Sequence, residues 1–415
     1  MSSYLSVKEA QQRILKVFNV KPVEFVVLEQ ANRRVLAQDI IANVNLPPFD
    51  NSSMDGFAVR TEDVKLATRD SPVILQVVAD IPAGISPALT IQPGQAARIM
   101  TGAQMPKGAD AVVPVEYTDA SQDPNSRLPE QVRIFHAPRP GEYVRPTGQD
   151  VRQGQTVLNA GRKLSPQDIG LLASLGVTPV PVYQKARVAL LTTGDELIQP
   201  DQPLTPGKIR DSNSYTLAAM IEMSDAIPIR LGNAPDDPPV IQKYLDLAVD
   251  QKVDLILTSA GVSVGTYDFV RNIIEQHGHL EFWRVNMRPG KPIAFGAYKG
   301  IPLIGLPGNP VSSFVGFMVF VRPILQKMAG IPQERRDFLR VRLAEPVESD
   351  GRETYFRCSI SVEKGVLTAT LAGHQGSANL VGLTKANALL IVPAGVKSLP
   401  TGAELEAWPI SSDFA

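Results

Sequence analysis

Ser259-Ala-Gly-Val-Ser-Val-Gly-Thr-Tyr-Asp268 and Leu306-Pro-Gly-Asn-Pro-Val-Ser312 are the two stretches that decide the fold. Each follows a short apolar run, residues 253–258 or 301–305, and each precedes a segment with helical apolar spacing. Two adjacent strand–loop–helix units place backbone N–H groups and helix N-termini along one edge of a parallel sheet, where proteins bind phosphates and other oxyanions. For one such loop, Gly and Pro as turn residues explain the pattern equally well. Two loops in one domain favour an anion site.

The whole chain is predicted to be a multidomain α/β protein, because 415 residues are more than one domain with a single hydrophobic core usually contains. Strands and helices alternate over residues 184–330, which predicts a doubly wound parallel α/β domain. Residues 48–147 read as an inserted β-rich domain, and residues 331–415 as a C-terminal β barrel or sandwich. Residues 1–47 and 148–183 form a discontinuous linker domain with small helical segments, including a helix expected over residues 29–39.

Composition excludes several classes of function. The 41 basic and 42 acidic residues give a net charge of −1, so nothing attracts the chain to nucleic acid or to an anionic membrane. Cys358 is the single cysteine and the four histidines are scattered, so a catalytic metal would be oxygen-ligated, with Mg²⁺ the natural choice. Without a signal peptide or an apolar run long enough to span a membrane, the sequence indicates a cytoplasmic protein.

Carboxylates follow the strands of the predicted parallel sheet. Glu196, Asp236 and Asp268 each come soon after a strand, so we expect them at the sheet edge that carries the anion loops. A divalent cation between these carboxylates and a phosphate would explain the arrangement. The alternative is that Asp236 and Asp237 simply cap the next helix.

Cations lie between the two anion loops. Arg284, Arg288 and Lys291 belong to a segment stiffened by Pro289 and Pro292, and this segment could hold a tetrahedral oxyanion. The alternative is a solvated basic turn. In the inserted domain, Asp55 and Thr101 accompany tight-turn glycines, and the residues alone indicate no more than turns there.

A series of motifs in order along the chain carries a family resemblance. They are Asp50-Asn-Ser-Ser-Met-Asp-Gly-Phe-Ala-Val59, Met100-Thr-Gly-Ala103, Gly108-Ala-Asp-Ala-Val-Val113, Thr193-Gly-Asp-Glu-Leu197, Gly261-Val-Ser-Val-Gly265, Pro289-Gly-Lys-Pro292 and Gly305-Leu-Pro-Gly-Asn-Pro-Val-Ser312. The chain resembles the MoeA-type molybdopterin molybdenumtransferases, relatives of the gephyrin E domain, over essentially its whole length. Each motif is weak alone, whereas the ordered series is specific.

The resemblance implies the insertion of molybdate into adenylyl-molybdopterin, with Mg²⁺-dependent release of AMP. It also implies a MogA-like α/β domain, and a homodimer whose active site combines the α/β domain of one subunit with the inserted domain of the other. A molybdopterin adenylyltransferase is a possible partner protein.

The resemblance also implies roles for individual residues. Asp55, Thr101, Asp150 and Glu196 match catalytic positions, and Asp236 and Asp268 match Mg²⁺ ligands. The substrate-binding positions for molybdate and the adenylylated molybdopterin are Gly261, Ser263, Gly265, Arg284, Arg288, Lys291, Ser312, Arg352 and Ser377.

Three questions stay open at this stage. The family often has Lys where Arg284 and Arg288 stand, so a preference for tungstate over molybdate is an alternative. Arg357 lies five residues from Arg352, and either could line the oxyanion pocket. A gephyrin-like binding scaffold is the alternative from another functional class, although a scaffold has no use for the carboxylates and oxyanion-pocket residues that this chain retains.

Overall fold

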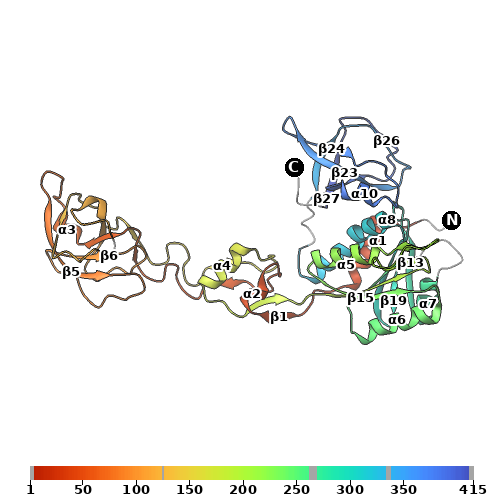
Figure 1. The fold of residues 1–415 in the computed structure, drawn as a ribbon, viewed down its shortest axis with the longest axis horizontal. Coiled ribbons are helices and arrows are strands. Elements are labelled where there is room, and N and C mark those ends of the chain that lie inside the picture. Colours follow the sequence, from red (N-terminus) through yellow and green to blue (C-terminus); the bar gives the residue numbers. More distant parts are fainter. Residues whose placement is uncertain (1–3, 124–125, 261–268, 333–337, 411–415) are drawn as a thin grey trace. The chain divides into compact units, whose positions relative to one another are not determined.

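The computed structural model describes residues 4–123, 126–260, 269–332 and 338–410. The chain divides into two compact units, and Figure 1 colours it by sequence. The first unit holds Met1–Ala37, Gly161–Ser165 and Pro179–Ala415, and the second holds Gln38–Ala160 and Pro166–Thr178. The four-domain division expected from the sequence is finer than these two units and stays a prediction.

The first unit contains the expected α/β sheet, in the strand order β15-β12-β16-β20-β19-β17. Its strands are β12 (Arg187–Thr193), β15 (Ile227–Ala234), β16 (Leu255–Ser259), β17 (Gly278–Arg284), β19 (Pro292–Tyr298) and β20 (Ile301–Leu306). The first four strands of this order are parallel, and β19 and β17 extend the sheet antiparallel. The parallel strands therefore all end at one edge, which is where ligands bind in such sheets.

Helices cover both faces of this sheet because its strands are apolar on both sides. On β12, Val188 and Leu190 face one core, while Ala189 and Leu191 face the other. The helices are α1 (Val7–Val17), α5 (Asn213–Met223), α6 (Pro238–Asp250), α7 (Phe269–His277), α8 (Pro310–Gly316), the π-helix η2 (Phe317–Val321) and α9 (Arg322–Met328). α1, α5, α8, η2 and α9 pack into the first core, and α6 and α7 into the second.

One helical stretch in the described part of the chain, Pro310–Met328, is long and apolar enough to cross a membrane. Because 78% of its most apolar window is buried inside the protein, we read it as a core helix. It runs through α8, η2 and α9 and packs on the α/β sheet beside α1 and α5.

The C-terminal part of the first unit is a closed β barrel. Its sheet has the order β18-β23-β24-β21-β27-β25, and a further pairing of β23 with β25 closes the ring. The elements are β18 (Met287–Arg288), β21 (Leu339–Leu343), β22 (Val347–Glu348), β23 (Glu353–Glu363), β24 (Val366–Leu371), α10 (Leu380–Thr384), β25 (Ala388–Val392), β26 (Ser398–Leu399) and β27 (Glu404–Pro409). β18 comes from the loop of the α/β domain and pairs in parallel with β23.

The remaining elements of the first unit are short. They are β1 (Val23–Val26), α2 (Leu28–Ala31), β11 (Val180–Tyr183), β13 (Leu197–Ile198) and β14 (Ile209–Arg210). The helix expected over residues 29–39 is wrong beyond Ala31. Arg33 has a φ of 64°, and Leu36 N–H donates to the carbonyl of Arg162, so tertiary pairing with a distant segment overrides the helical spacing.

The second unit is built on a β sheet of order β7-β4-β6-β5-β8. Its elements are β2 (Ile40–Ile41), β3 (Asn51–Ser52), β4 (Gly56–Val59), α3 (Thr61–Val64), β5 (Val73–Ile81), β6 (Gln95–Ile99), β7 (Ala111–Pro114), the 3₁₀ helix η1 (Val115–Tyr117), β8 (Gln131–Ile134), β9 (Val144–Arg145), β10 (Thr156–Leu158) and α4 (Pro166–Ser174). Side chains of β4 alternate between two cores, with Phe57 and Val59 on one side and Ala58 on the other.

A substitution at Gly278, the first residue of β17, would test how closely the strands of the α/β sheet pack. A Cβ at this position would lie 1.8 Å from the carbonyl oxygen of Ala297 on β19. Gly278→Ala should therefore force β17 away from β19 and lower the free energy of unfolding by about 1–3 kcal/mol. Gly170→Ala in α4 is the matched control, because nothing lies within 4 Å of its Cβ position and alanine favours helix. Thermal unfolding should show opposite shifts, and an unchanged Gly278→Ala protein would contradict the packing.

Candidate functional site

Three carboxylates gather at the carboxyl ends of β12 and β15. Asp195 and Glu196 follow β12, and Asp236 follows β15. The backbone N–H of Asp236 donates to Asp195 Oδ1 at 3.2 Å, which joins the two loops. Gly194, with a φ of 142°, makes room for this arrangement, since a Cβ there would lie 2.5 Å from Glu196 Oε2. The sheet edge therefore collects negative charge, as the strand ends suggested.

The surroundings of Asp236 disfavour its charged form. Partial burial raises the pKa of its carboxyl above the ordinary value, and the nearby charges of Asp195 and Glu196 raise it further. The capping alternative for this segment is weakened, because Asp237 is the N-cap of α6 but its side chain makes no cap hydrogen bond. A cation bound here would relieve the repulsion between these carboxylates.

Four of the predicted site residues lie outside the described residues. They are Gly261, Ser263, Gly265 and Asp268. The part of the chain that the structure describes contains no group of three His, Cys, Asp or Glu side chains arranged to hold a metal ion. The metal-ligand assignment of Asp236 and Asp268 stays a prediction.

A cavity of about 540 Å³ opens beside these carboxylates. Glu196, Asp211, Asn213 and Ser259 are among its lining residues. Asn213 Nδ2 donates to Ser259 Oγ and to the carbonyl of Gly308, both at 2.7 Å, and so ties α5 to the two loops after β16 and β20. Asp211 is buried and accepts from Thr192 Oγ1 at 3.0 Å and from the backbone N–H of Ser214. The cavity thus combines a largely apolar lining with a few polar groups held by hydrogen bonds, as is usual for a ligand site.

A second cavity, of about 320 Å³, brings together five of the predicted oxyanion-binding residues. They are Arg288, Lys291, Ser312, Arg352 and Ser377. Residue Pro292 lines both cavities. The pairing of β18 with β23 explains the assembly, because it places Arg288 opposite Thr354, two residues from Arg352. Cations and hydroxyl groups facing one small cavity are the groups that bind an oxyanion.

Arg288 and Arg352, the two more exposed arginines of this cavity, share a counter-ion. Arg352 donates to Asp350 through Nε at 3.0 Å and Nη2 at 2.5 Å, and Arg288 Nη1 lies 3.6 Å from the same carboxylate. These hydrogen bonds and charges hold the pKa of Asp350 below its usual value. Asp350 thereby orients the two guanidinium groups that face the cavity.

The structure places Arg357 in the wall of the same cavity. Its side chain is 1% exposed, and burial lowers the pKa of its guanidinium. Arg352, by contrast, is partly exposed. Both arginines therefore line this cavity, and which of them would contact an oxyanion stays a prediction.

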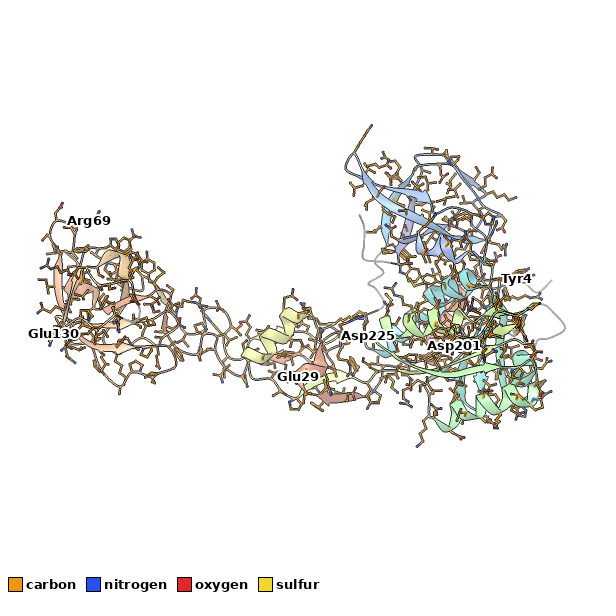
Figure 2. The ribbon with its side chains drawn as sticks, in the orientation of Figure 1. Tyr4, Glu29, Arg69, Glu130, Asp201 and Asp225 are labelled. Atoms are coloured by element: carbon orange, nitrogen blue, oxygen red, sulfur yellow. The ribbon has the colours of Figure 1, made fainter. Side chains whose placement is uncertain are left out.

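Arg284 lies apart from this wall and is not among its lining residues. Arg284 and Lys291 both lie near the hydroxyl of Tyr4 in the first unit, which is labelled in Figure 2. Lys291 Nζ lies 4.5 Å from the centre of the Tyr4 ring, and its hydrogen bond and charge lower the pKa of the Tyr4 hydroxyl. Asn286 N–H donates to the carbonyl of Leu5, which holds the N-terminal segment at this loop.

Sequence reasoning missed several residues of these cavities. Asp211, Asn213 and Asn309 line the cavity at the sheet edge, and none of them was among the predicted site residues. Asp350 and Tyr4 carried no signal, because their roles depend on contacts between distant segments.

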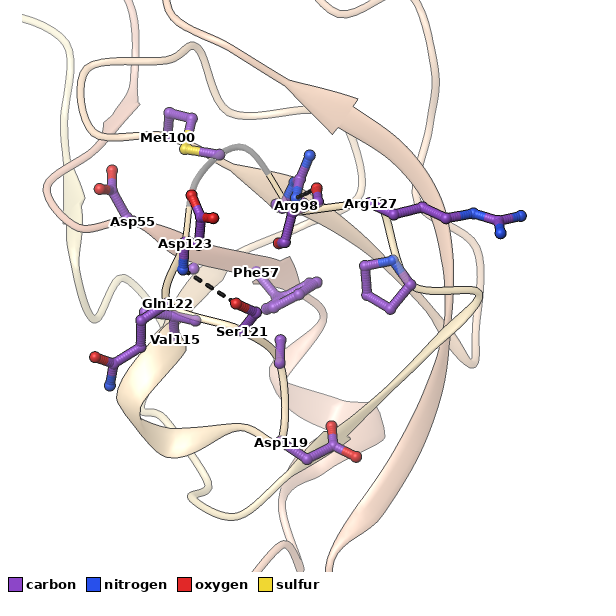
Figure 3. A pocket seen from close by; sticks show the side chains of 14 residues that line it. Asp55, Phe57, Arg98, Met100, Val115, Asp119, Ser121, Gln122, Asp123 and Arg127 are labelled. Carbon is purple, nitrogen blue, oxygen red and sulfur yellow. Dashed lines mark hydrogen bonds between the residues drawn. The ribbon is translucent and has the colours of Figure 1, made fainter.

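In the second unit, Asp55 and Thr101 lie in direct contact. Asp55 Oδ1 accepts from the backbone N–H of Thr101 at 2.7 Å and from its hydroxyl at 2.8 Å. Asp55 also lines a cavity of about 170 Å³ with Phe57, Arg98 and Met100 (Figure 3). The threonine thus fixes one oxygen of an exposed carboxylate beside a cavity.

Asp150 lies elsewhere in the second unit. Its carboxylate accepts from Arg145 Nη2 at 2.8 Å, and its backbone N–H donates to the carbonyl of Leu46. Asp150 is not among the residues that line the cavity beside Asp55. The structure therefore joins Asp55 with Thr101 and leaves Asp150 apart from them.

Comparison with known proteins matches three regions in order. Residues 5–176 match the MoeA N-terminal region (domain I and II), residues 189–327 a probable molybdopterin binding domain, and residues 340–410 the MoeA C-terminal region (domain IV).

Similar proteins extend over the whole chain. A molybdopterin molybdenumtransferase from Nostoc is 40% identical over 94% of this chain and 91% of its own length. Molybdopterin molybdenumtransferase 2 from Mycobacterium tuberculosis is 40% identical over 98% of this chain and 100% of its own. A crystal structure of a molybdopterin biosynthesis MoeA protein from Pyrococcus is similar with a TM-score of 0.82 and 30% identity, covering 99% of this chain and 100% of that one. With these matches, the chain belongs to the MoeA family of molybdopterin molybdenumtransferases.

Proposed function

We propose that this enzyme inserts molybdenum from molybdate into adenylyl-molybdopterin and releases AMP. The observation that carries the proposal is the cavity formed by Arg288, Lys291 and Arg352 beside the cavity at the sheet edge. The first has the charge and size for a tetrahedral oxyanion, and the second has room for part of a larger polar substrate. Their common wall at Pro292 would bring the two substrates next to each other.

Different residues of the second cavity would have different roles in the reaction. Lys291 and the arginines hold molybdate and withdraw charge, while Ser312 and Ser377 donate hydrogen bonds to its oxygens. An oxygen of the held molybdate is then placed to attack the phosphoanhydride, and the AMP phosphate leaves with the electrons of the broken P–O bond. A preference for tungstate follows the same geometry and remains the second candidate, because Arg288 binds either oxyanion.

Mg²⁺ is the proposed cofactor. Asp236 and Asp268 would hold the ion. Burial and the charges of Asp195 and Glu196 raise the pKa of the Asp236 carboxyl, so a cation bound beside it would be stabilising. When bound, Mg²⁺ would neutralise negative charge on the pyrophosphate. Asp195 and Glu196 would keep the ion at this edge of the sheet.

We further propose a cytoplasmic homodimer in which Asp55 and Thr101 of one subunit complete the site of the other. The support is the family resemblance of both motifs, together with the Thr101 contacts that fix the Asp55 carboxylate. A molybdopterin adenylyltransferase is the partner protein that would supply the substrate.

AMP release from adenylyl-molybdopterin tests the reaction. With Mg²⁺ present, release should depend on added molybdate, and parallel samples with tungstate identify the preferred oxyanion. Tight nucleotide binding without oxyanion-dependent release would instead support a scaffold, the class represented by the gephyrin E domain.

Mixed dimers test the shared site. Asp55→Ala and Lys291→Ala should each abolish most AMP release alone, because each removes one half of every site. Co-expressed, the two variants should regain part of the wild-type rate, since a mixed dimer contains one intact site. Lys291→Ala with Ser377→Ala is the control pair and should not regain activity. Inactive mixed dimers of the first pair would contradict the shared site.

Asp236→Asn tests the carboxylate cluster through stability. Because the folded-state pKa of Asp236 is raised, its ionisation costs stability as the pH rises from the ordinary aspartate value of 3.8 through the higher folded-state value. At neutral pH and without Mg²⁺, Asp236→Asn should therefore raise Tm by about 1 °C, an effect kept small by solvent screening. This gain should vanish below pH 3.8.

Mg²⁺ should raise the Tm of the wild-type protein and leave that of Asp236→Asn nearly unchanged. Asp246→Asn is a suitable control, because Asp246 on α6 pairs with Lys299 in the turn after β19, and neither residue lines either cavity. An equal Mg²⁺ response in wild type and Asp236→Asn would remove Asp236 from the metal site.

A further inference from the structure

The N-terminal segment lies against the loop that carries Lys291. Leu5 pairs with Val285 in a parallel bridge, and the carbonyl of Leu5 accepts from the backbone N–H of Asn286 at 2.8 Å. The loop is closed by the backbone N–H of Val285, which donates to the carbonyl of Lys291 at 3.1 Å. The first described residues of the chain are therefore joined to a loop that comes much later in the sequence.

Helix α1 holds the same segment from its other end. Ser6 is the N-cap of α1 and forms a capping box with Glu9, whose carboxylate accepts from the backbone N–H of Ser6 at 3.0 Å. Buried residues of α1 belong to the first core of the α/β sheet. Because the loop holds Leu5 and the helix holds Ser6, the position of Tyr4 just before them is restricted.

The ring of Tyr4 contacts the ammonium group of Lys291. Lys291 Nζ lies 4.5 Å from the centre of the ring, which is within the range of a cation–π interaction. Lys291 is half-buried and lines the cavity with Arg288 and Arg352, whereas Tyr4 is 43% exposed and is not among the lining residues. Tyr4 therefore contacts a cation of the cavity wall without being part of that wall.

The cations of this cavity are held in two different ways. Arg288 and Arg352 both pair with the carboxylate of Asp350, which offsets part of their charge. Among the described residues, no carboxylate pairs with Lys291 in this way. An aromatic ring attracts a cation through its quadrupole but carries no net charge. The contact with Tyr4 therefore orients Lys291 and leaves its full charge available to an anion.

Orientation matters for a lysine because its four-carbon stem is flexible. Immobilising such a side chain when a ligand binds costs free energy, and a contact that restricts the side chain beforehand lowers that cost. We propose that Tyr4 is a positioning residue for Lys291, whose ammonium group the Tyr4 ring holds in place for an oxyanion in the cavity. This rests on the proposed function of the cavity. Tyr4 would thereby raise the affinity for molybdate and leave the chemical step unchanged.

Substitutions at Tyr4 test this role through molybdate affinity. Tyr4→Leu removes the ring, so KM for molybdate and the Kd measured by calorimetry should rise about two- to fivefold, as expected for an exposed cation–π contact. The kcat and the KM for adenylyl-molybdopterin should stay nearly unchanged. Tyr4→Trp restores an aromatic face and should bind molybdate as the wild type does, a rescue that a general disturbance of the segment would not show.

Tyr215→Leu is the matched control. Tyr215 is also 43% exposed, and its ring also contacts a cation, since Arg230 Cζ lies 3.9 Å from the ring centre. Neither Tyr215 nor Arg230 lines the cavity with Lys291, so Tyr215→Leu should leave KM and Kd for molybdate unchanged. In a Lys291→Met background, Tyr4→Leu should raise the Kd for molybdate little further, because the group that the ring positions is already gone.

The outcomes separate this proposal from the proposed function. If the wild-type protein neither binds molybdate nor releases AMP in response to it, the proposed function fails. If the wild type does both, but Tyr4→Leu binds molybdate as tightly as the wild type or Tyr4→Trp binds it no better than Tyr4→Leu, the role of Tyr4 fails. Tighter binding by Tyr4→Leu would also overturn it, because the ring would then withhold Lys291 from the oxyanion.

Discussion

The short parallel pairing of β18 with β23 is the constraint on which the cavity lined by Arg288, Lys291 and Arg352 depends. It joins the loop after β17 to the C-terminal barrel through two residue pairs, Met287 with Glu353 and Arg288 with Thr354. The register places Arg288 beside Arg352, and Arg352 Nη1 reinforces it by donating to the carbonyl of Met287 at 3.2 Å. A slip of one residue would turn these side chains to the opposite face. The α/β domain and the barrel therefore contribute to one cavity because this seam fixes their register.

Local patterns in the sequence were sufficient to predict the strands of the α/β domain and the carboxylates at their ends. Residues of β12 alternate between two apolar cores, and the strand ends carry Glu196 and Asp236, so the sheet and its acidic edge follow from periodicity and strand order. Lys291 and Arg288 were recognisable because they are close in sequence to one stiff loop. The resemblance added Arg352 and Ser377, which no local pattern could have joined to that loop.

What the sequence could not show depends on contacts between distant segments. Arg357 binds carbonyls 17 to 22 residues away, and nothing at Arg357 itself distinguishes it from Arg352. Asp350 matters only because β18 brings Arg288 to it. The helix expected over residues 29–39 failed for a related reason, since Leu36 pairs with Arg162 on a segment that returns much later in the chain. Periodicity describes what a segment prefers alone, and these segments are decided by their partners.

The two cavities carry unfavourable charge of opposite sign. At the sheet edge, burial and the charges of Asp195 and Glu196 raise the pKa of Asp236, whereas in the neighbouring cavity Arg357 is buried without a counter-ion among the described residues. Each arrangement costs stability, and a ligand of the opposite charge would offset that cost. Because Pro292 belongs to both walls, the two ligands would bind next to each other. Because the negative and positive side chains lie in separate cavities, they do not neutralise each other. A cation and an oxyanion can therefore bind side by side. A single cluster of both charges would form ion pairs within itself and would attract neither ligand.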